Sequence, residues 1–218
     1  MKERPIIMGA ESVRAILEGR KTQTRRVIDP HKYNIGGWDM PRTKEDMEAG
    51  YPFAENADGD FVSVVDWCPY GRVGERLYVK ERFAYWIGRE AVAYSDMCHK
   101  SIEDIEWEDE VNISNIAEGG KWKSPMYMPR WASRITLEIT DIRVERVQDI
   151  TEEDAKAEGC DDTPYEQPWD GPGTWEGVKF GWITRARYRT LWNSLNAKRG
   201  YSWEKNPWVW AITFKVVS

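Results

Sequence analysis

The stretch "RITLEITDIRVERV", residues 134–147, decides the fold class. Apolar and polar residues alternate from Ile135 to Ile139, the pattern of a strand with one buried face. After Asp141 the apolar positions move by one residue, so that Ile142 begins a second apolar set. Because side chains alternate strictly between the faces of a strand, this shift predicts a β-bulge or a tight turn at Asp141. The segment is therefore expected to form a strand that is interrupted at Asp141 by a bulge or by a tight turn.

Shorter strands are expected on both sides of this segment, from alternation or from β-branched residues. They cover residues 6–7, 22–28, 61–65, 74–83 and 207–217. In the last of these, one face is filled by apolar side chains, namely Trp208, Trp210, Ile212, Phe214 and Val216.

Three helices are also expected. In "ESVRAILEGRK", residues 11–21, the apolar residues Val13, Ile16 and Leu17 form one stripe, and Gly19 stands where helices commonly end. In "ITEEDAKAEG", residues 150–159, Thr151 is a plausible N-cap with Asp154 three residues later. The third helix, residues 182–200, carries an apolar stripe of four residues, Tyr188, Leu191, Trp192 and Leu195.

The strands outnumber the helices and do not alternate with them regularly, which argues against a parallel α/β sheet. We therefore expect an α+β fold, a small and mostly antiparallel β-barrel with flanking helices, in a single domain spanning residues 1–218. Three segments without sustained periodicity are interpreted as insertions, at about 29–60, 99–124 and 160–179.

Composition limits the function classes. The net charge of −6 excludes a general DNA-coating protein, so any nucleic-acid contact must be a local patch. The three cysteines are scattered and odd in number, which argues against a disulfide framework. The sequence shows no signal-peptide pattern and no apolar run of ~20 residues. We therefore expect a cytoplasmic protein with no membrane partner. The cysteine and histidine spacings fit no standard metal site, so no metal is expected.

The basic cluster "GRKTQTRR", residues 19–26, is the strongest candidate for chemistry. Lys21 could simply complement the negative end of the first helix. Alternatively, its arginine neighbours would favour loss of its proton by repulsion, and a lysine so perturbed can act as a general base. Thr24 offers a hydroxyl nucleophile, but residues 21 and 24 of one extended strand point to opposite faces, which leaves Thr22 as a rival.

Glu158 ends the second helix, where the helix dipole disfavours a carboxylate. It is either a solvated charge or a carboxylate held toward a cationic pocket. Trp131, between Arg130 and Arg134, either packs at the rim of the sheet or offers a face on which a base can stack beside cations.

The insertions and the Trp-rich C-terminal part resemble those of the phage and prophage members of the ASCH-domain family of PUA-like proteins, and four segments together resemble the family as a whole. They are "ILEGRKTQTRR", "GERLYVKERF", "MPRWASRITLEITDIRVERVQDITEEDAKAEG" and "NPWVWAITFKVV", and they cover about half of the chain. The first also resembles the "GRKTxTxR" motif of the bacterial N4-acetylcytidine amidohydrolase, and "TEEDAKAE" its "TExxAxxE" motif. Arg25 departs from that enzyme, which has an apolar residue there, and predicts a more cationic site.

The resemblance implies Lys21 as the base, Thr24 as the nucleophile and Glu158 as the orienting or proton-carrying carboxylate. Substrate contacts are expected from a further set of residues, Arg20, Arg26, Arg130 and Trp131. The implied function is an amidohydrolase that removes an acyl group from a modified nucleobase such as N4-acetylcytidine, without metal or organic cofactor. The alternative is a non-catalytic module for a modified base or single-stranded RNA, and a nuclease is a weaker third reading.

Overall fold

The computed structural model describes residues 2–29, 36–39, 53–55, 61–85, 105–107, 123–160 and 181–217. Three α-helices are found in these parts of the chain, α1 (Ala10–Leu17), α3 (Glu152–Ala157) and α4 (Gly181–Asn196). The strands are β1 (Glu3–Ile7), β2 (Gln23–Val27), β3 (Gly36–Asp39), β4 (Phe53–Glu55), β5 (Phe61–Ser63), β6 (Arg76–Lys80), β7 (Phe83–Tyr85), β8 (Ile105–Trp107), β9 (Thr136–Arg146) and β10 (Trp208–Val216).

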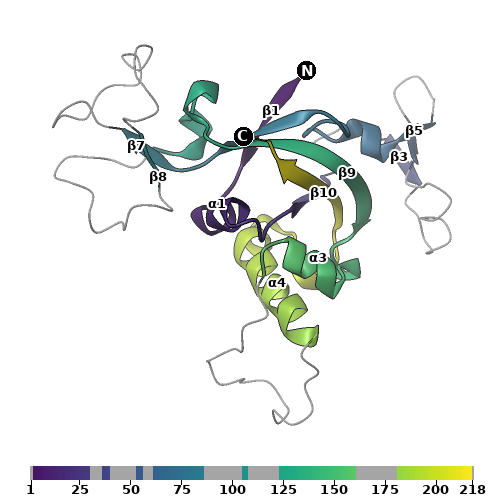
Figure 1. Ribbon diagram of the computed structural model, residues 1–218. Coiled ribbons are helices and arrows are strands. Elements are labelled where there is room, and N and C mark those ends of the chain that lie inside the picture. Colours follow the sequence, from purple (N-terminus) through teal and green to yellow (C-terminus); the bar gives the residue numbers. More distant parts are fainter. Residues whose placement is uncertain are drawn as a thin grey trace, which may run out of the picture.

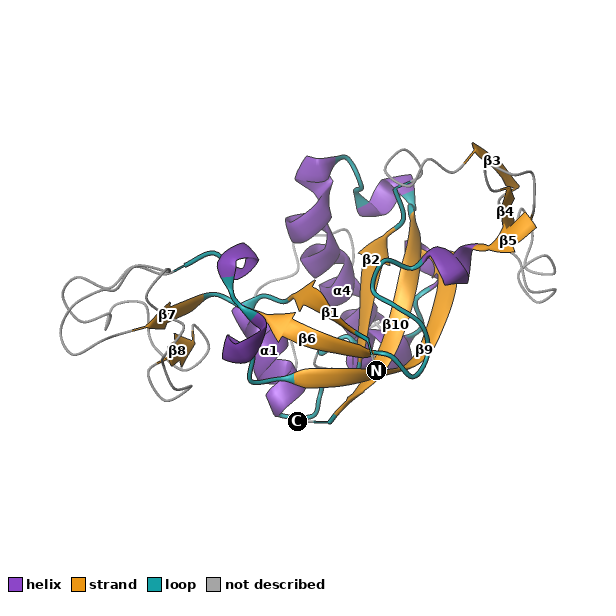
Figure 2. Cartoon of the chain, turned by 90° about the horizontal axis from the view of Figure 1, so that it is seen from above, coloured by secondary structure: helices purple, strands orange, loops and turns teal. Residues whose placement is uncertain are grey.

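Five strands form the main sheet, in the order β1-β6-β9-β10-β2 (Figures 1 and 2). All of its pairings are antiparallel except that of β1 with β6, which is parallel. The α+β class and the mostly antiparallel sheet agree with expectation, but the barrel does not. The sheet is strongly curved, as Figure 1 shows. Within the described residues its edge strands β1 and β2 are not paired with each other, so the sheet remains open.

The predicted irregularity in the long strand is confirmed. Asp141 pairs with Thr213 and Ile139 pairs with the next residue, Phe214, so that β9 has one extra residue at this point. Such a bulge lets Ile139 and Ile142 face the same side, and both are buried.

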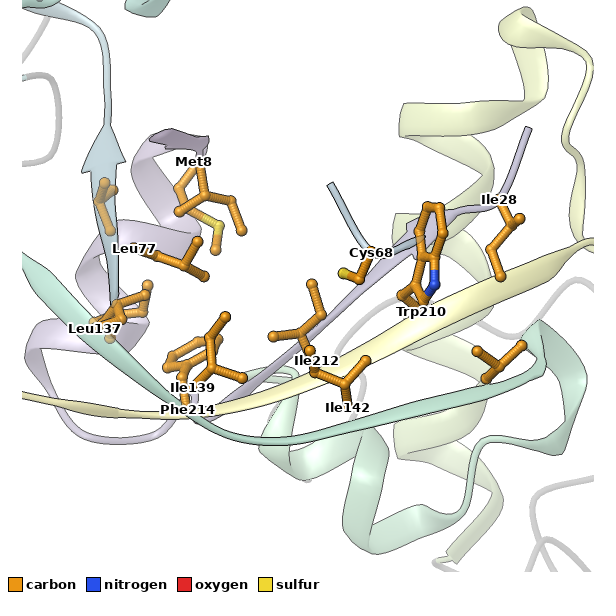
Figure 3. Close-up of a cluster of buried hydrophobic side chains, with 14 of the residues drawn as sticks. Met8, Ile28, Cys68, Leu77, Leu137, Ile139, Ile142, Trp210, Ile212 and Phe214 are labelled. Atoms are coloured by element: carbon orange, nitrogen blue, oxygen red, sulfur yellow. The ribbon is translucent and has the colours of Figure 1, made fainter. Parts of the chain in front are cut away.

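The main apolar core lies on one face of this sheet (Figure 3). Strands β6, β9 and β10 contribute the side chains that fill it, among them Leu77, Leu137, Trp210, Ile212 and Phe214. Removing this much apolar surface from water, at about 25 cal/mol per Å², is the main stabilising contribution to such a fold.

The second face of the sheet is covered by α3 and α4, which contact each other, while α3 also contacts β2. Figure 1 shows these two helices together below the curved strands. A smaller cluster fills the space between them and the sheet, made of Val147, Ile150, Ala155, Tyr188, Trp192, Trp203 and Val209. The predicted N-cap of α3 is confirmed, because the Thr151 hydroxyl accepts a hydrogen bond from the Asp154 amide at 3.1 Å.

Some apolar side chains do not lie where the periodicity placed them. Leu17, Leu195 and Val216 are 52%, 64% and 48% exposed, whereas Val13 and Ile16 are buried as expected. Each of the three exposed residues lies in the last turn or the last positions of its element, where the neighbouring element no longer covers it.

Much of the three predicted insertions lies outside the described residues. Inside the first, β3 and β4 pair with each other and β4 pairs with β5, so part of that segment is a small antiparallel sheet rather than a loop. Inside the second, β8 pairs with β7. No helix in the described residues has both the length and the apolar character needed to cross a membrane.

Candidate active site

Main-chain contacts bring the end of α3 against the segment that joins α1 to β2. Lys21 and Glu158 form an isolated antiparallel bridge, and the Thr22 amide donates to the Ala157 carbonyl at 2.8 Å. The Lys21 amide in turn donates to the Ala15 carbonyl of α1. Two motifs that are far apart in the sequence therefore meet through their backbones, and their side chains are held there.

The Lys21 ammonium and the Glu158 carboxylate form a buried ion pair. Lys21 Nζ lies 2.6 Å from Glu158 Oε2 and 2.7 Å from the Glu158 main-chain oxygen. The two side chains are only 3% and 5% exposed. Burying two charges is costly unless they are paired and hydrogen-bonded, so this contact is a specific feature and not a solvated helix end.

Gly159 makes this close approach sterically possible. Its φ is +90°, a left-handed conformation that glycine adopts without the Cβ penalty. A Cβ at this position would lie 3.1 Å from the Ala15 Cβ and 3.3 Å from the Lys21 Cβ. A side chain here would therefore push Lys21 away from α3.

Beneath the pair, Arg25 is held by three carboxylates. Its guanidinium lies 2.6 Å from Glu145 Oε1, 3.0 Å from Asp154 Oδ2 and 3.3 Å from Glu158 Oε1, and its side chain is fully buried. Arg25 also donates to Gln23 Oε1 at 2.7 Å. Residues 21, 23 and 25 thus share one face of the chain, as the alternation of a strand requires.

Carboxylates compensate the cations of this network. Arg143 lies 3.0 Å from Asp154 and 3.6 Å from both Glu145 and Asp141, so each of the cations Lys21, Arg25 and Arg143 is paired with at least one carboxylate. The expectation that Arg25 makes the site more cationic is therefore wrong, because strand β9 and helix α3 supply the compensating charges.

The pKa values reflect this pairing. Burial opposes the charge of Arg25, but the carboxylates around it outweigh burial and hold its pKa above the ordinary value. Burial would raise the pKa of Asp154, yet Arg25 and Arg143 hold it below the ordinary value. Burial raises the pKa of the neighbouring Cys160 thiol to about 11.

Thr24 lies on the other face of β2. It pairs with Ile212 of β10, whose side chain belongs to the main apolar core, and it is 5% exposed. Both hydrogen bonds that Lys21 Nζ makes within the described residues end on Glu158. The structure thus brings Lys21 and Glu158 together and places Thr24 on the opposite side of the strand. Thr22, the rival hydroxyl, is exposed.

Arg20 and Arg26 also point in different directions. Arg20 pairs with Glu18 and donates to the Gly159 carbonyl at 3.2 Å, next to Glu158. Arg26 shares the face of Thr24, and its guanidinium donates to the Ile7 carbonyl at 2.7 Å. Because Ile7 ends β1, this side chain connects the two open edges of the main sheet.

Arg130 and Trp131 lie apart from the ion pair, in a 3-10 turn (Arg130–Ala132) ahead of β9. Arg130 donates to Glu3 at 2.6 Å and lies 5.2 Å above the Tyr78 ring. Trp131 is 38% exposed, which leaves part of its ring open to solvent.

Sequence reasoning missed Glu145 and Asp154 as members of the cluster. Alternation indicates only that Arg143 and Glu145 share the strand face opposite to Ile142, and their contacts with Arg25 and with Asp154 of α3 depend on long-range packing. In the described residues no group of three or more histidine, cysteine, aspartate or glutamate side chains has a metal-binding arrangement. The histidines considered for a metal or a catalytic triad, His31 and His99, lie outside the described residues.

No family model matches the chain, and no curated protein matches it. A solved structure that aligns with it is that of an ASCH domain from Lactobacillus crispatus JV V101. The alignment covers 99% of this chain and 79% of that chain, with 11% sequence identity and a TM-score of 0.38. A TM-score this low supports no conclusion about this chain, and the likeness to ASCH domains remains a resemblance of sequence motifs.

Proposed function

We propose that the chain binds a modified nucleoside and removes an acyl group from its base, with N4-acetylcytidine as the reference substrate. The observation that carries the proposal is the buried pair of Lys21 and Glu158, a base and a carboxylate 2.6 Å apart. Acid–base catalysis needs two groups that can exchange a proton over a hydrogen bond, and this pair meets that requirement.

The reaction follows from the roles that the motif resemblance implies. Passing the Lys21 proton to Glu158 leaves an amine that takes the hydroxyl proton of Thr24. The Thr24 oxygen then attacks the acyl carbon, the bond from that carbon to the base nitrogen breaks, and the nitrogen receives the proton. Water hydrolyses the resulting ester, which releases the acid and restores the Thr24 hydroxyl.

This sequence of steps requires Lys21 Nζ to turn from Glu158 toward the face of β2 that carries Thr24. Lys21 precedes β2 and has a flexible four-carbon side chain, so the proposed turn is assigned to this side chain. Arg26 supports the proposal, because it shares the Thr24 face and can stabilise the negative charge that develops on the acyl oxygen.

A non-catalytic module for modified bases is the second candidate. The observation in its favour is the position of Thr24, which faces away from Lys21 Nζ in the structure. In that case Lys21 and Glu158 would serve as donor and acceptor for the edge of a base.

The test is incubation of the purified chain with N4-acetylcytidine, followed by chromatography for cytidine. Lys21→Ala is the test variant. Lys215→Ala, which removes an exposed lysine paired with Glu138, is the matched control for the loss of one lysine side chain. Conversion that is lost in Lys21→Ala and persists in Lys215→Ala supports the amidohydrolase. Binding of the nucleoside by calorimetry with no conversion supports the second candidate.

A further inference from the structure

Arg25 differs from every other cation near the site in the way it is held. Its side chain is fully buried, and it contacts three carboxylates from two elements. They are Glu145 of β9, Asp154 of α3 and Glu158, the C-cap of α3. An arginine fork is rigid and planar, so contacts in several directions fix its orientation as well as its position.

Two of these contacts anchor the guanidinium. Glu145 accepts from Nε at 2.8 Å and lies 2.6 Å from Nη2, and Asp154 lies 3.0 Å from the same Nη2. Arg143 approaches both carboxylates from the solvent side and completes their pairing. The ring of Tyr188, on α4, lies 5.8 Å from the Arg25 guanidinium carbon and closes the remaining side.

The third contact reaches the candidate active site. Nη1 donates to Glu158 Oε1 at 3.3 Å, while Lys21 Nζ holds the other carboxylate oxygen, Oε2, at 2.6 Å. The two oxygens of Glu158 thus have separate cationic partners on separate sides. With Oε1 engaged by Arg25, the Glu158 carboxyl is turned so that Oε2 faces Lys21.

We infer that Arg25 is a positioning residue, which orients Glu158 so that its Oε2 forms the proton-exchanging contact with Lys21. The side-chain hydrogen bonds of Arg25 go to Glu145, Gln23, Glu158 and Asp154, so its proposed effect on the reaction passes through Glu158. The inference rests on the proposed function for its catalytic consequence, although the orientation of Glu158 can be measured without any reaction.

The measurement uses the ammonium protons of Lys21. Protons held in buried hydrogen bonds exchange slowly with water, so the Lys21 ammonium should give a ¹H–¹⁵N signal, assigned by its loss in Lys21→Met. Arg25→Lys keeps the buried positive charge but loses the planar fork. Arg146→Lys is the matched control, because it makes the same substitution at an arginine whose hydrogen bond goes to the Asn206 carbonyl and whose guanidinium lies over the Trp208 ring.

We expect the Lys21 signal to be present in the wild type and in Arg146→Lys and to disappear in Arg25→Lys. On N4-acetylcytidine, Arg25→Lys should lower kcat by about 100-fold with KM close to the wild-type value, the size of effect that a misplaced catalytic group produces. Arg146→Lys should leave kcat near the wild-type value.

A Lys21 signal that is retained in folded Arg25→Lys would overturn the inference. If Arg25→Lys does not fold, the paired variant Arg25→Met with Glu145→Gln, which removes one cation and one anion together, is measured in its place, with the same expected loss. If the wild-type chain does not convert N4-acetylcytidine at all, the proposed function fails, while the Lys21 signal still decides whether Arg25 positions Glu158.

Discussion

Lys21 Nζ and Glu158 Oε2 lie 2.6 Å apart although 137 residues separate them in the sequence. Glu158 has a second cationic neighbour, Arg25, whereas Lys21 Nζ makes its hydrogen bonds only to Glu158 within the described residues. Removing Glu158 and removing Lys21 should therefore lower the free energy of unfolding by different amounts.

Glu158→Gln should destabilise the fold more than Lys21→Met. The first change leaves the Lys21 ammonium buried without its carboxylate, for which a loss of about 3–5 kcal/mol is typical. The second leaves Glu158 still paired with Arg25. Urea denaturation gives both values. Arg20→Ala, at an exposed pair with Glu18, is the control and should cost about 0–1 kcal/mol. Equal losses in the two buried variants would contradict this expected difference.

Gly159→Ala should destabilise the fold more than Gly19→Ala. Both glycines have positive φ, +90° and +73°, so both substitutions carry the left-handed penalty of about 1–2 kcal/mol. Only at Gly159 would the new Cβ also meet Ala15 and Lys21, and such overpacking adds about 1–3 kcal/mol. The difference between the two urea midpoints isolates the packing contribution. Equal midpoint shifts for the two variants would contradict the packing contribution, because the structure would then accommodate the Gly159→Ala Cβ without loss of stability.

Asp154→Asn should lose stability at neutral pH but not in acid. The pKa of Asp154 is held below its ordinary value, so its carboxylate stabilises the fold above about pH 4, and this contribution disappears as the pH falls through the folded-state pKa. Urea midpoints of the wild type and the variant should thus differ at pH 7 and converge toward pH 3. A difference that stays constant over this range would show that the interaction does not depend on the charge of Asp154.

Thr24→Val should abolish conversion of N4-acetylcytidine without loss of stability. Thr24 pairs with Ile212 on the apolar face of the sheet, where a methyl group is at least as well accommodated as a hydroxyl. Thr22→Val, at the exposed rival position, is the control and should remain active. Activity in folded Thr24→Val would exclude its hydroxyl as the nucleophile.

The elements that depend on local pattern could be predicted from the sequence. The bulge in β9 followed from the shift of apolar phase at Asp141, and the start of α3 from Thr151 and Asp154. Alternation along an extended segment places Lys21 and Thr24 on opposite sides, and they do lie so, although β2 begins only at Gln23.

The features that depend on long-range pairing could not be predicted. The parallel pairing of β1 with β6 joins residues such as Glu3 and Arg76, and nothing local specifies it. Whether the sheet closes depends on the distance between its edge strands, which here is spanned by the Arg26 side chain and not by a main-chain ladder. The compensation of Arg25 by Glu145 required knowing that two distant strands bury the same face.

The role of Thr24 as the nucleophile is tested most directly by locating the acyl group during a single turnover. The chain is mixed with a limiting amount of N4-acetylcytidine, quenched in acid, digested with trypsin and analysed by mass spectrometry. Cleavage after Lys21 and Arg25 isolates residues 22–25, and fragmentation distinguishes Thr22 from Thr24. We predict an acetyl group on Thr24 that appears and decays in the wild type and does not form in Lys21→Ala. Release of cytidine with no acetylated Thr24 at any time would contradict the proposed mechanism.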